Sequence, residues 1–203
     1  MKKVSKMILV TLVVALMLFP MAASAKTTQV FQENFAQENG EYPGSFFVLD
    51  EGAVQEVIQG RFVMVGGGEY GFTDHGAFLD IPESATHVTC AFKIKSDLNM
   101  MSAFVFVQGG QAVQVRFYGD TISASFGGEH DFMPVGTNSG EWTRVIFKID
   151  LTAGVYDLII DDVTVAEDLS VSAQALPFNI LVGTLGTEGE AAFDNIKVSV
   201  SDK

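Results

Sequence analysis

Cysteine and basic side chains are both scarce in this sequence. A single cysteine, Cys90, among 203 residues excludes an internal disulfide and any metal site built from several thiolates. Only 12 Lys and Arg side chains stand against 25 Asp and Glu, which gives a net charge of −13. Nucleic acids and anionic lipid surfaces are bound through clusters of basic side chains. We therefore expect neither of them as a partner of this protein.

Long apolar runs are missing as well, except for one near the N-terminus. Three lysines within residues 1–6 precede an almost wholly apolar stretch over 7–21, and small residues fill 23–25. This order is typical of a secretory signal peptide, and the stretch of 15 residues is shorter than the roughly 20 that a membrane-spanning helix needs. We expect cleavage after Ala25 and export of residues 26–203 as one domain, extracellular or periplasmic, with no stable insertion in a membrane. An uncleaved N-terminal anchor is the alternative.

Helical periodicity is also absent over most of the chain, and alternation of apolar and polar residues takes its place. Valine and phenylalanine alternate with other residues in 113–118, and 145–150 and 156–161 alternate in the same way. Such alternation is typical of strands with one face in a core. Between two of these runs, Gly119-Asp120 suits a tight hairpin, because glycine accepts a positive φ. Further strand candidates are 30–35, 46–49, 61–65, 77–81, 86–95, 103–108, 121–126, 163–166, 178–184 and 191–200.

The number of short strands predicts the architecture. A single sheet of about thirteen strands would leave an apolar face in water, so two stacked sheets are required. We therefore predict an all-β fold, a two-sheet antiparallel β-sandwich of the jelly-roll type. Only 167–175 is left for a short helix or an irregular crossover, ended by Pro177. Cys90 lies in an alternating run and is expected in the core.

Three stretches of the sequence together carry a resemblance to a known family. They are VFQENF at 30–35, followed by Pro43-Gly44; EWTRVIFKID at 141–150 with its hairpin partner at 154–162; and FDNIKV at 193–198. Together they resemble the concanavalin A-like lectin/glucanase superfamily, in particular its laminin-G-like bacterial members. The resemblance implies a jelly roll in which Trp142 is a structural core residue. It says less about activity, because this fold hosts lectins, hydrolases, lyases and adhesive domains.

The closing stretch contains a conflict of spacing. Phe193 and Ile196 are three positions apart, so strict alternation cannot turn both of them toward the core. A bulge near Asp194-Asn195 would reconcile the two residues with one strand. We therefore predict an irregular backbone at this point of the last strand.

A calcium site follows from the resemblance. In this fold the first and last strands lie together, which would bring Glu33 near Asp194, and some relatives hold a structural Ca²⁺ near such a place. Hard cations take oxygens from carboxylates and carbonyls. We therefore name Ca²⁺ as a candidate cofactor, with Glu33 and Asp194 as its ligands. The alternative is that both carboxylates only cap strand ends and accept hydrogen bonds from backbone amides.

A sugar-binding face is the second candidate site. Sugars present apolar CH faces and a rim of hydroxyls, so their sites combine aromatic rings with hydrogen-bonding side chains. Such side chains lie on the non-core face of the strand at 111–118, on its hairpin partner and in the following loop. The candidate ligand-binding residues are Gln114, Arg116, Tyr118, Ser123, Ser125 and His130. The resemblance implies that a glycan would lie on the concave sheet, and the alternative is an ordinary solvated strand face.

The sequence lacks the strings that would place catalytic groups. Glycoside hydrolysis needs two carboxylates at a defined separation, and the E-x-D-x-x-E string of the glucanase branch does not occur. The alginate-lyase-like strings are absent too. We therefore predict a secreted, non-catalytic, lectin-like domain that recognises an extracellular or cell-surface glycan. The alternatives are a glycoside hydrolase or polysaccharide lyase of the same fold, and a structural or adhesive protein with protein partners.

Overall fold

The described part of the chain is built from strands alone. The computed structural model describes residues 26–36, 47–48, 54–65, 73–99, 101–108, 111–126, 131–171, 178–185 and 189–202. Every regular element in these ranges is a β-strand. Within them, no helix has the length and apolar character that crossing a membrane requires. The leader at 1–25 lies outside the described residues, so the signal peptide stays a prediction.

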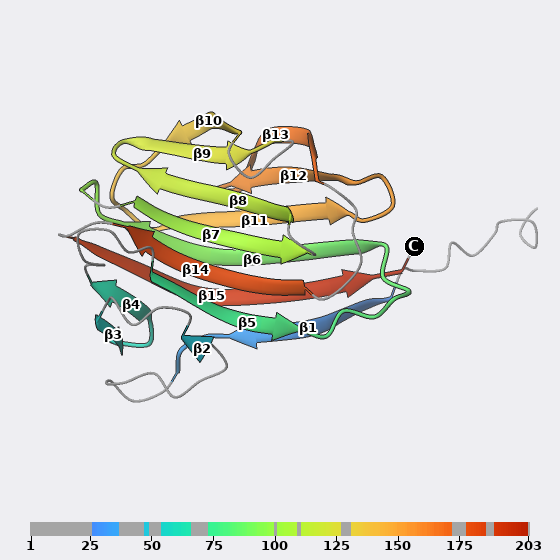
Figure 1. Cartoon of the computed structure of the whole chain (residues 1–203), viewed down its shortest axis with the longest axis horizontal. Coiled ribbons are helices and arrows are strands. Elements are labelled where there is room, and N and C mark those ends of the chain that lie inside the picture. Colours follow the sequence, from blue (N-terminus) through green and yellow to red (C-terminus); the bar gives the residue numbers. More distant parts are fainter. Residues whose placement is uncertain are drawn as a thin grey trace, which may run out of the picture.

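The strands form two antiparallel sheets that lie face to face, with their strands running in roughly the same direction across Figure 1. Sheet A contains, in spatial order, β13 (Val163–Ser170), β12 (Val155–Ile160), β11 (Thr143–Asp150), β6 (His87–Ser96), β15 (Glu190–Ser201), β4 (Phe62–Val65) and β3 (Val54–Val57), and β1 (Thr27–Glu33) pairs with β15. Sheet B contains β10 (Phe132–Thr137), β9 (Thr121–Ser125), β8 (Gln111–Tyr118), β7 (Met101–Gln108), β14 (Phe178–Leu185), β5 (Thr73–Leu79) and β2 (Phe47–Val48). This arrangement confirms the predicted all-β, two-sheet antiparallel sandwich.

The core lies between the two sheets. Burial alternates along β11 and β12, as packing of one strand face requires. The ring centroid of Phe147 lies 5.8 Å from that of Phe92 and 5.9 Å from that of Tyr156, the second pair edge to face. Full burial of one such side chain contributes about 1.5–3 kcal/mol to stability. Cys90 is buried in the same core, as predicted.

The long strand β15 connects the N-terminal strands to the middle of sheet A. One of its edges pairs with β6, and the other pairs with β4 and then with β1. The register against β6 shifts between Asp194 and Lys197, and Asn195 has a φ of 52°. Both Phe193 and Ile196 are fully buried. The predicted bulge is therefore confirmed.

The structure corrects the prediction for 167–175. Glu167–Ser170 is neither helical nor irregular but continues β13, because it pairs with β12 across register shifts. Residues 172–177, which include Pro177, lie outside the described residues. Two strands were not predicted. β3 has only four residues, and Pro134 and Gly136 interrupt the alternation in β10 at a register shift.

Trp142 lies outside the core, contrary to the expectation. Its side chain is half-buried, and the guanidinium carbon of Arg61 lies 5.7 Å from the ring centroid. A cation at this distance from an aromatic ring is attracted by the electron-rich ring face. Trp142 therefore packs with Arg61 at the start of β11 and does not fill the space between the sheets.

Candidate functional site

The outer face of sheet B carries the predicted sugar-binding residues. Alternate residues of β8 are buried in the core, so Gln114, Arg116 and Tyr118 lie on the opposite side of the strand. In β9, Ser123 lies directly opposite Arg116. Ser125 lies two positions further along the same side. We call the surface formed by these residues and their neighbours in register the outer face of sheet B.

These residues differ in exposure and therefore in what they can contact. Tyr118 is 68% exposed, whereas Gln114 and Ser125 are only 8% and 3% exposed. The backbone amide of Gln114 donates a hydrogen bond of 2.9 Å to the Ser125 hydroxyl, so Ser125 joins β9 to β8. Arg116 and Ser123 are half-buried. His130 lies outside the described residues.

Arg116 is held in place by two neighbours. Its guanidinium carbon lies 3.7 Å from the ring centroid of Phe132 in β10. Its Nη2 donates a hydrogen bond of 3.3 Å to Oε1 of Gln114, while Nε is buried without a hydrogen-bond partner among the described residues. Desolvation by burial lowers the pKa of Arg116 below its ordinary value. Arginine remains charged at neutral pH despite such a shift.

The strands around Arg116 contain very little charge. β10, β9, β8, β7 and β14 are consecutive neighbours in sheet B, and Arg116 is the single charged residue in their sequences. Sheet A differs, since β11 alone contains Arg144, Lys148 and Asp150. The two sheets therefore present chemically different surfaces, one charged and one mostly neutral.

Small residues occupy the middle of the outer face of sheet B. Arg116 lies opposite Ala103 of β7, and Ala103 lies opposite Gly183 of β14. The next position in this row is Asp74 of β5. Because neighbouring strands are spaced about 4.8 Å apart, the row spans about 14 Å of sheet surface. This row could not be predicted from the sequence, because no single segment of the chain contains the spatial order of β7, β14 and β5.

One exposed apolar side chain, that of Phe78, also lies on the outer face of sheet B. The large exposed apolar side chains among the described residues are Ile58, Phe78, Leu98, Tyr118, Phe126, Met133 and Val163. Phe78 in β5 is 68% exposed. In the sheet register it stands in one row with Asn179 of β14, Val107 of β7 and Ala112 of β8. Ala112 shares a strand side with Gln114, so Phe78 and Tyr118 lie on one face of the sheet. Alternation within 77–81 indicates that Phe78 faces away from the core, but it does not indicate to which sheet this strand belongs.

The two predicted calcium ligands lie near each other in the sheet and have local partners. β1 pairs with β15, as the resemblance implied, and Glu33 stands opposite Ile196, two positions from Asp194. Oε1 of Glu33 accepts a hydrogen bond of 2.8 Å from the amide of Phe35. Oδ2 of Asp194 accepts one of 2.7 Å from Nδ2 of Asn195. In the part of the chain that the structure describes, no three Asp, Glu, His or Cys side chains group as metal ligands.

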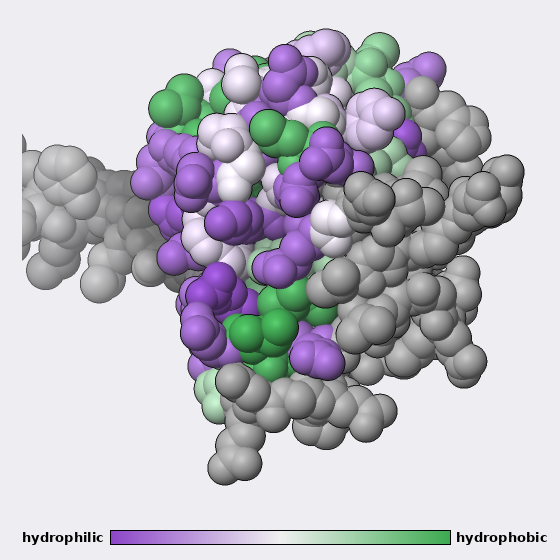
Figure 2. Space-filling model, turned by 90° about the vertical axis from the view of Figure 1, so that its left-hand side faces the viewer, coloured by the Kyte–Doolittle hydropathy of each residue, from purple (hydrophilic) through white to green (hydrophobic). Residues whose placement is uncertain are grey.

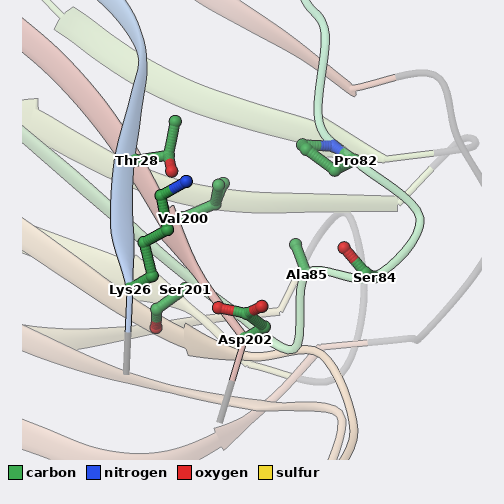
Figure 3. A pocket seen from close by; sticks show the side chains of 8 residues that line it. All are labelled: Lys26, Thr28, Pro82, Ser84, Ala85, Val200, Ser201 and Asp202. Atoms are coloured by element: carbon green, nitrogen blue, oxygen red, sulfur yellow. The ribbon is translucent and has the colours of Figure 1, made fainter. Parts of the chain in front are cut away.

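Two pockets lie away from the outer face of sheet B. A pocket of about 260 Å³ lies on sheet A beside Lys148, where Nε2 of His87 is 3.4 Å from Oδ2 of Asp150. A pocket of about 140 Å³ lies where β1 begins and β15 ends, between the side chains of Lys26 and Asp202 (Figure 3). The end of the molecule in Figure 2 is mainly hydrophilic over the described residues, with a larger group of hydrophobic side chains low in the view and smaller ones above it. Neither pocket is lined by an exposed aromatic ring.

Comparisons with known proteins match the structure and not the sequence. No protein-family profile and no curated protein sequence matches the chain. Among solved structures, it is similar to SCLam, a non-specific endo-β-1,3(4)-glucanase from family GH16, with 11% identity, a TM-score of 0.63 and coverage of 89% of this chain and 93% of the glucanase. It is similar to the potassium-bound carbohydrate recognition domain of Emp46p, with 14% identity, a TM-score of 0.54 and coverage of 76% and 88%.

A third similarity covers only part of a larger protein. The chain matches a sialidase with 9% identity and a TM-score of 0.63, over 76% of this chain and 17% of the sialidase. At such identities a structural match establishes the fold and leaves the activity open. The chain has the concanavalin A-like jelly-roll fold, as the sequence resemblance implied.

Proposed function

We propose that this protein is an exported, non-catalytic domain that binds a carbohydrate on the outer face of sheet B. The observation that carries the proposal is the chemistry of that face. Two exposed aromatic side chains, Phe78 of β5 and Tyr118 of β8, lie on this face, and the five consecutive strands from β10 to β14 contain one charged residue, Arg116. In the row from Arg116 to Asp74, the two residues between these ends are Ala103 and Gly183.

This combination suits a sugar chain on physical grounds. The CH faces of sugar rings pack on aromatic rings, and their hydroxyls exchange hydrogen bonds with neutral polar side chains. Ser123 and Tyr118 bring hydroxyl groups to this face. A protein partner would be expected to need a larger contiguous apolar patch. The seven large exposed apolar residues of the described part are distributed over both sheets and their loops.

The distribution of carboxylates supports a binding role over a hydrolytic one. Glycoside hydrolysis needs an acid and a second carboxylate on either side of the scissile bond. The strands β7 to β10 and β14 contain no Asp or Glu, and β5 contains one, Asp74. A pair of carboxylates therefore cannot be formed within the strands of sheet B. The similarity to a glucanase and to a carbohydrate recognition domain is compatible with a glycan ligand and does not choose between the two roles.

A retention assay on insoluble polysaccharides tests the proposal. Neutral glucans, xylans and mannans are compared with uronate-containing polymers, for the wild type and for Tyr118→Ala. Loss of one stacking ring is expected to weaken binding about two- to tenfold. Val163→Ala is the matched control, because Val163 is 62% exposed and begins β13 in the other sheet. The proposal would be contradicted if no polysaccharide retained the protein, or if the wild type and Tyr118→Ala were retained equally.

The same samples test the enzymatic alternatives. A hydrolase would release reducing ends, and a lyase would release unsaturated products that absorb in the ultraviolet. The proposal expects neither product from any polymer that retains the protein. Accumulation of either product by the wild type would replace the binding role with an enzymatic one.

Export and calcium complete the proposal. Lys26, the first residue after the expected cleavage site, directly precedes β1. We expect a secreted protein whose N-terminus is Lys26, which the intact mass of the exported protein would establish. We also retain Ca²⁺ near Glu33 and Asp194 as a structural cofactor, because both carboxylates lie on paired strands beside a bulge. An exported protein whose mass still includes residues 1–25 would contradict the cleavage.

A further inference from the structure

Arg116 is the single charged residue in five consecutive strands of sheet B, and the next charged residue in its row, Asp74 of β5, lies about 14 Å away across the sheet. The sequences of β7, β8, β9, β10 and β14 contain no Asp, Glu, Lys or His and no second Arg. Among the described residues, the ion pairs are those of His87 with Asp150 and of Arg144 with Asp162, and both lie on sheet A. Arg116 therefore has no carboxylate partner within the described residues. A partly buried charge without a counter-charge is costly.

The surroundings of the guanidinium hold it in place without neutralising it. Phe132 covers one face of the plane at 3.7 Å, and Gln114 accepts a hydrogen bond from Nη2. Both partners are neutral, and Gln114 is itself buried. The side chain is thus ordered before any ligand arrives. A group that is already ordered loses less conformational entropy on binding.

The guanidinium also keeps hydrogen-bonding capacity. Nε is buried without a partner, and Nη1 forms no hydrogen bond with any described residue and is not among the buried unpaired atoms. An anionic group would therefore reach the guanidinium from its Nη end. Planar carboxylates match the fork of a guanidinium with two parallel hydrogen bonds.

We propose that the glycan bound on the outer face of sheet B carries a carboxylate, that of a uronic acid residue, and that this carboxylate pairs with Arg116. The inference rests on the proposed function and narrows its substrate class. The ligand would be a chain of mostly neutral sugars with isolated uronates, because one guanidinium serves one carboxylate. A densely charged polyanion fits less well, since the net charge of the chain is −13 and like charges repel at close range.

Matched pairs of polysaccharides test this inference. Each uronate-containing polymer, such as glucuronoxylan, alginate or polygalacturonate, is compared with the same polymer after chemical reduction of its carboxyl groups. Binding is measured for the wild type, Arg116→Gln and Arg116→Lys, and melting curves check that each variant is folded. Lys148→Gln on sheet A is the matched control, because it also removes one positive charge. A sulfated galactan serves as an additional arm, to separate a carboxylate from a sulfate ester.

The wild type is expected to bind at least one native polymer, glucuronoxylan foremost, about tenfold more tightly than its reduced form, the value of a charge-assisted hydrogen-bonded pair. Arg116→Gln should lose this preference and keep the affinity for the reduced form. Arg116→Lys should keep part of the preference, because it keeps the charge and loses the fork. Lys148→Gln should behave as the wild type.

Three results would overturn the inference. The first is that the wild type binds the native and the reduced form of every polymer equally well. The second is that Arg116→Gln still prefers the native polymer. The third is that the wild type binds the sulfated galactan more tightly than any uronate-containing polymer. In the first case, binding of both forms would leave the proposed carbohydrate-binding function standing. Absence of binding to any polymer, reduced or native, would instead remove the proposed function itself.

Discussion

The phenol hydroxyl of Tyr156 in sheet A donates a hydrogen bond to the backbone carbonyl of Ser125 in sheet B. The pairing of β8 with β9 ends at Val115 and Ala124. If the regular ladder continued by one residue, Gln114 and Ser125 would form a hydrogen-bonded pair. There the amide of Gln114 would donate to this carbonyl. Instead it donates to the Ser125 hydroxyl at 2.9 Å. The Ser125 carbonyl accepts its hydrogen bond from Tyr156 across the core, and this bond joins the two sheets.

Removal of the Tyr156 hydroxyl should destabilise the fold measurably. Tyr156 is 1% exposed, and Tyr156→Phe leaves the Ser125 carbonyl without this partner inside the protein. A buried polar group that loses its partner costs about 1–3 kcal/mol of unfolding free energy. Urea denaturation measures this loss. Tyr118→Phe is the control, because Tyr118 is exposed and the change should stay within about 0.5 kcal/mol. Equal effects of the two substitutions would contradict the assignment.

Alkaline pH should destabilise the wild type more than Tyr156→Phe. Desolvation by burial raises the pKa of Tyr156 to about 12. An unfolded tyrosine ionises near pH 10. The unfolded state therefore loses its proton first, so the contribution of Tyr156 is complete below about pH 10 and declines up to about pH 12. Unfolding free energies at pH 9 and pH 11.5 should show the two proteins converging, and a constant difference would contradict the raised pKa.

The turn between β12 and β13 should tolerate glycine. Asp161 and Asp162 have φ values of 47° and 66°, a conformation that glycine adopts without strain. Asp162→Gly also removes the exposed ion pair with Arg144, which is worth about 0.2–1 kcal/mol. Relief of backbone strain should offset this loss, so thermal melting should change little or rise. Asp162→Asn, which removes only the charge, should lower stability by less than about 1 kcal/mol. A larger loss would show that the ion pair matters more than its exposure suggests.

Cys90 should be inert in the folded protein. It is fully buried, and desolvation raises the pKa of its thiol. The thiolate is the reactive form of cysteine, so a thiol reagent should label Cys90 only as fast as the protein opens. Labelling is compared in native buffer and in denaturant. Rapid stoichiometric labelling without denaturant would show that the core around Cys90 is accessible.

Added Ca²⁺ should raise the melting temperature if the predicted site exists. A ligand at a hundredfold excess over its dissociation constant stabilises the folded state by about 2.7 kcal/mol. Glu33→Gln and Asp194→Asn should each reduce the response. Glu56→Gln in β3 is the control, because it removes an exposed carboxylate from another strand. Identical melting in chelator and in Ca²⁺ would remove calcium from the proposal.

Local chemistry explains what the sequence analysis predicted correctly. Alternation in 111–118 placed Gln114, Arg116 and Tyr118 on one side of a strand, because side chains switch sides at every residue of any extended chain. The bulge near Asp194 followed from the same rule, through a spacing that the rule forbids. Both inferences need only the neighbours in sequence.

Other parts of the site depend on residues far apart in the chain. Phe132 lies under Arg116 although β10, with Pro134, does not resemble a strand. Tyr156 reaches Ser125 across 31 positions of sequence and from the opposite sheet. The burial of Gln114 and Ser125 was equally invisible, because alternation says which side a residue is on and not what covers that side.

The amino-acid sequence by itself determined that this chain is an acidic, all-β sandwich and which side of β8 faces away from its core. Net charge is a sum over residues, and strand periodicity is a pattern among neighbouring residues, so neither depends on how the strands are ordered in the sheets. The tertiary structure alone decided that Arg116, Ala103, Gly183 and Asp74 form one row across sheet B. Strand order and register result from the packing of two whole sheets, and no short segment of sequence contains that information.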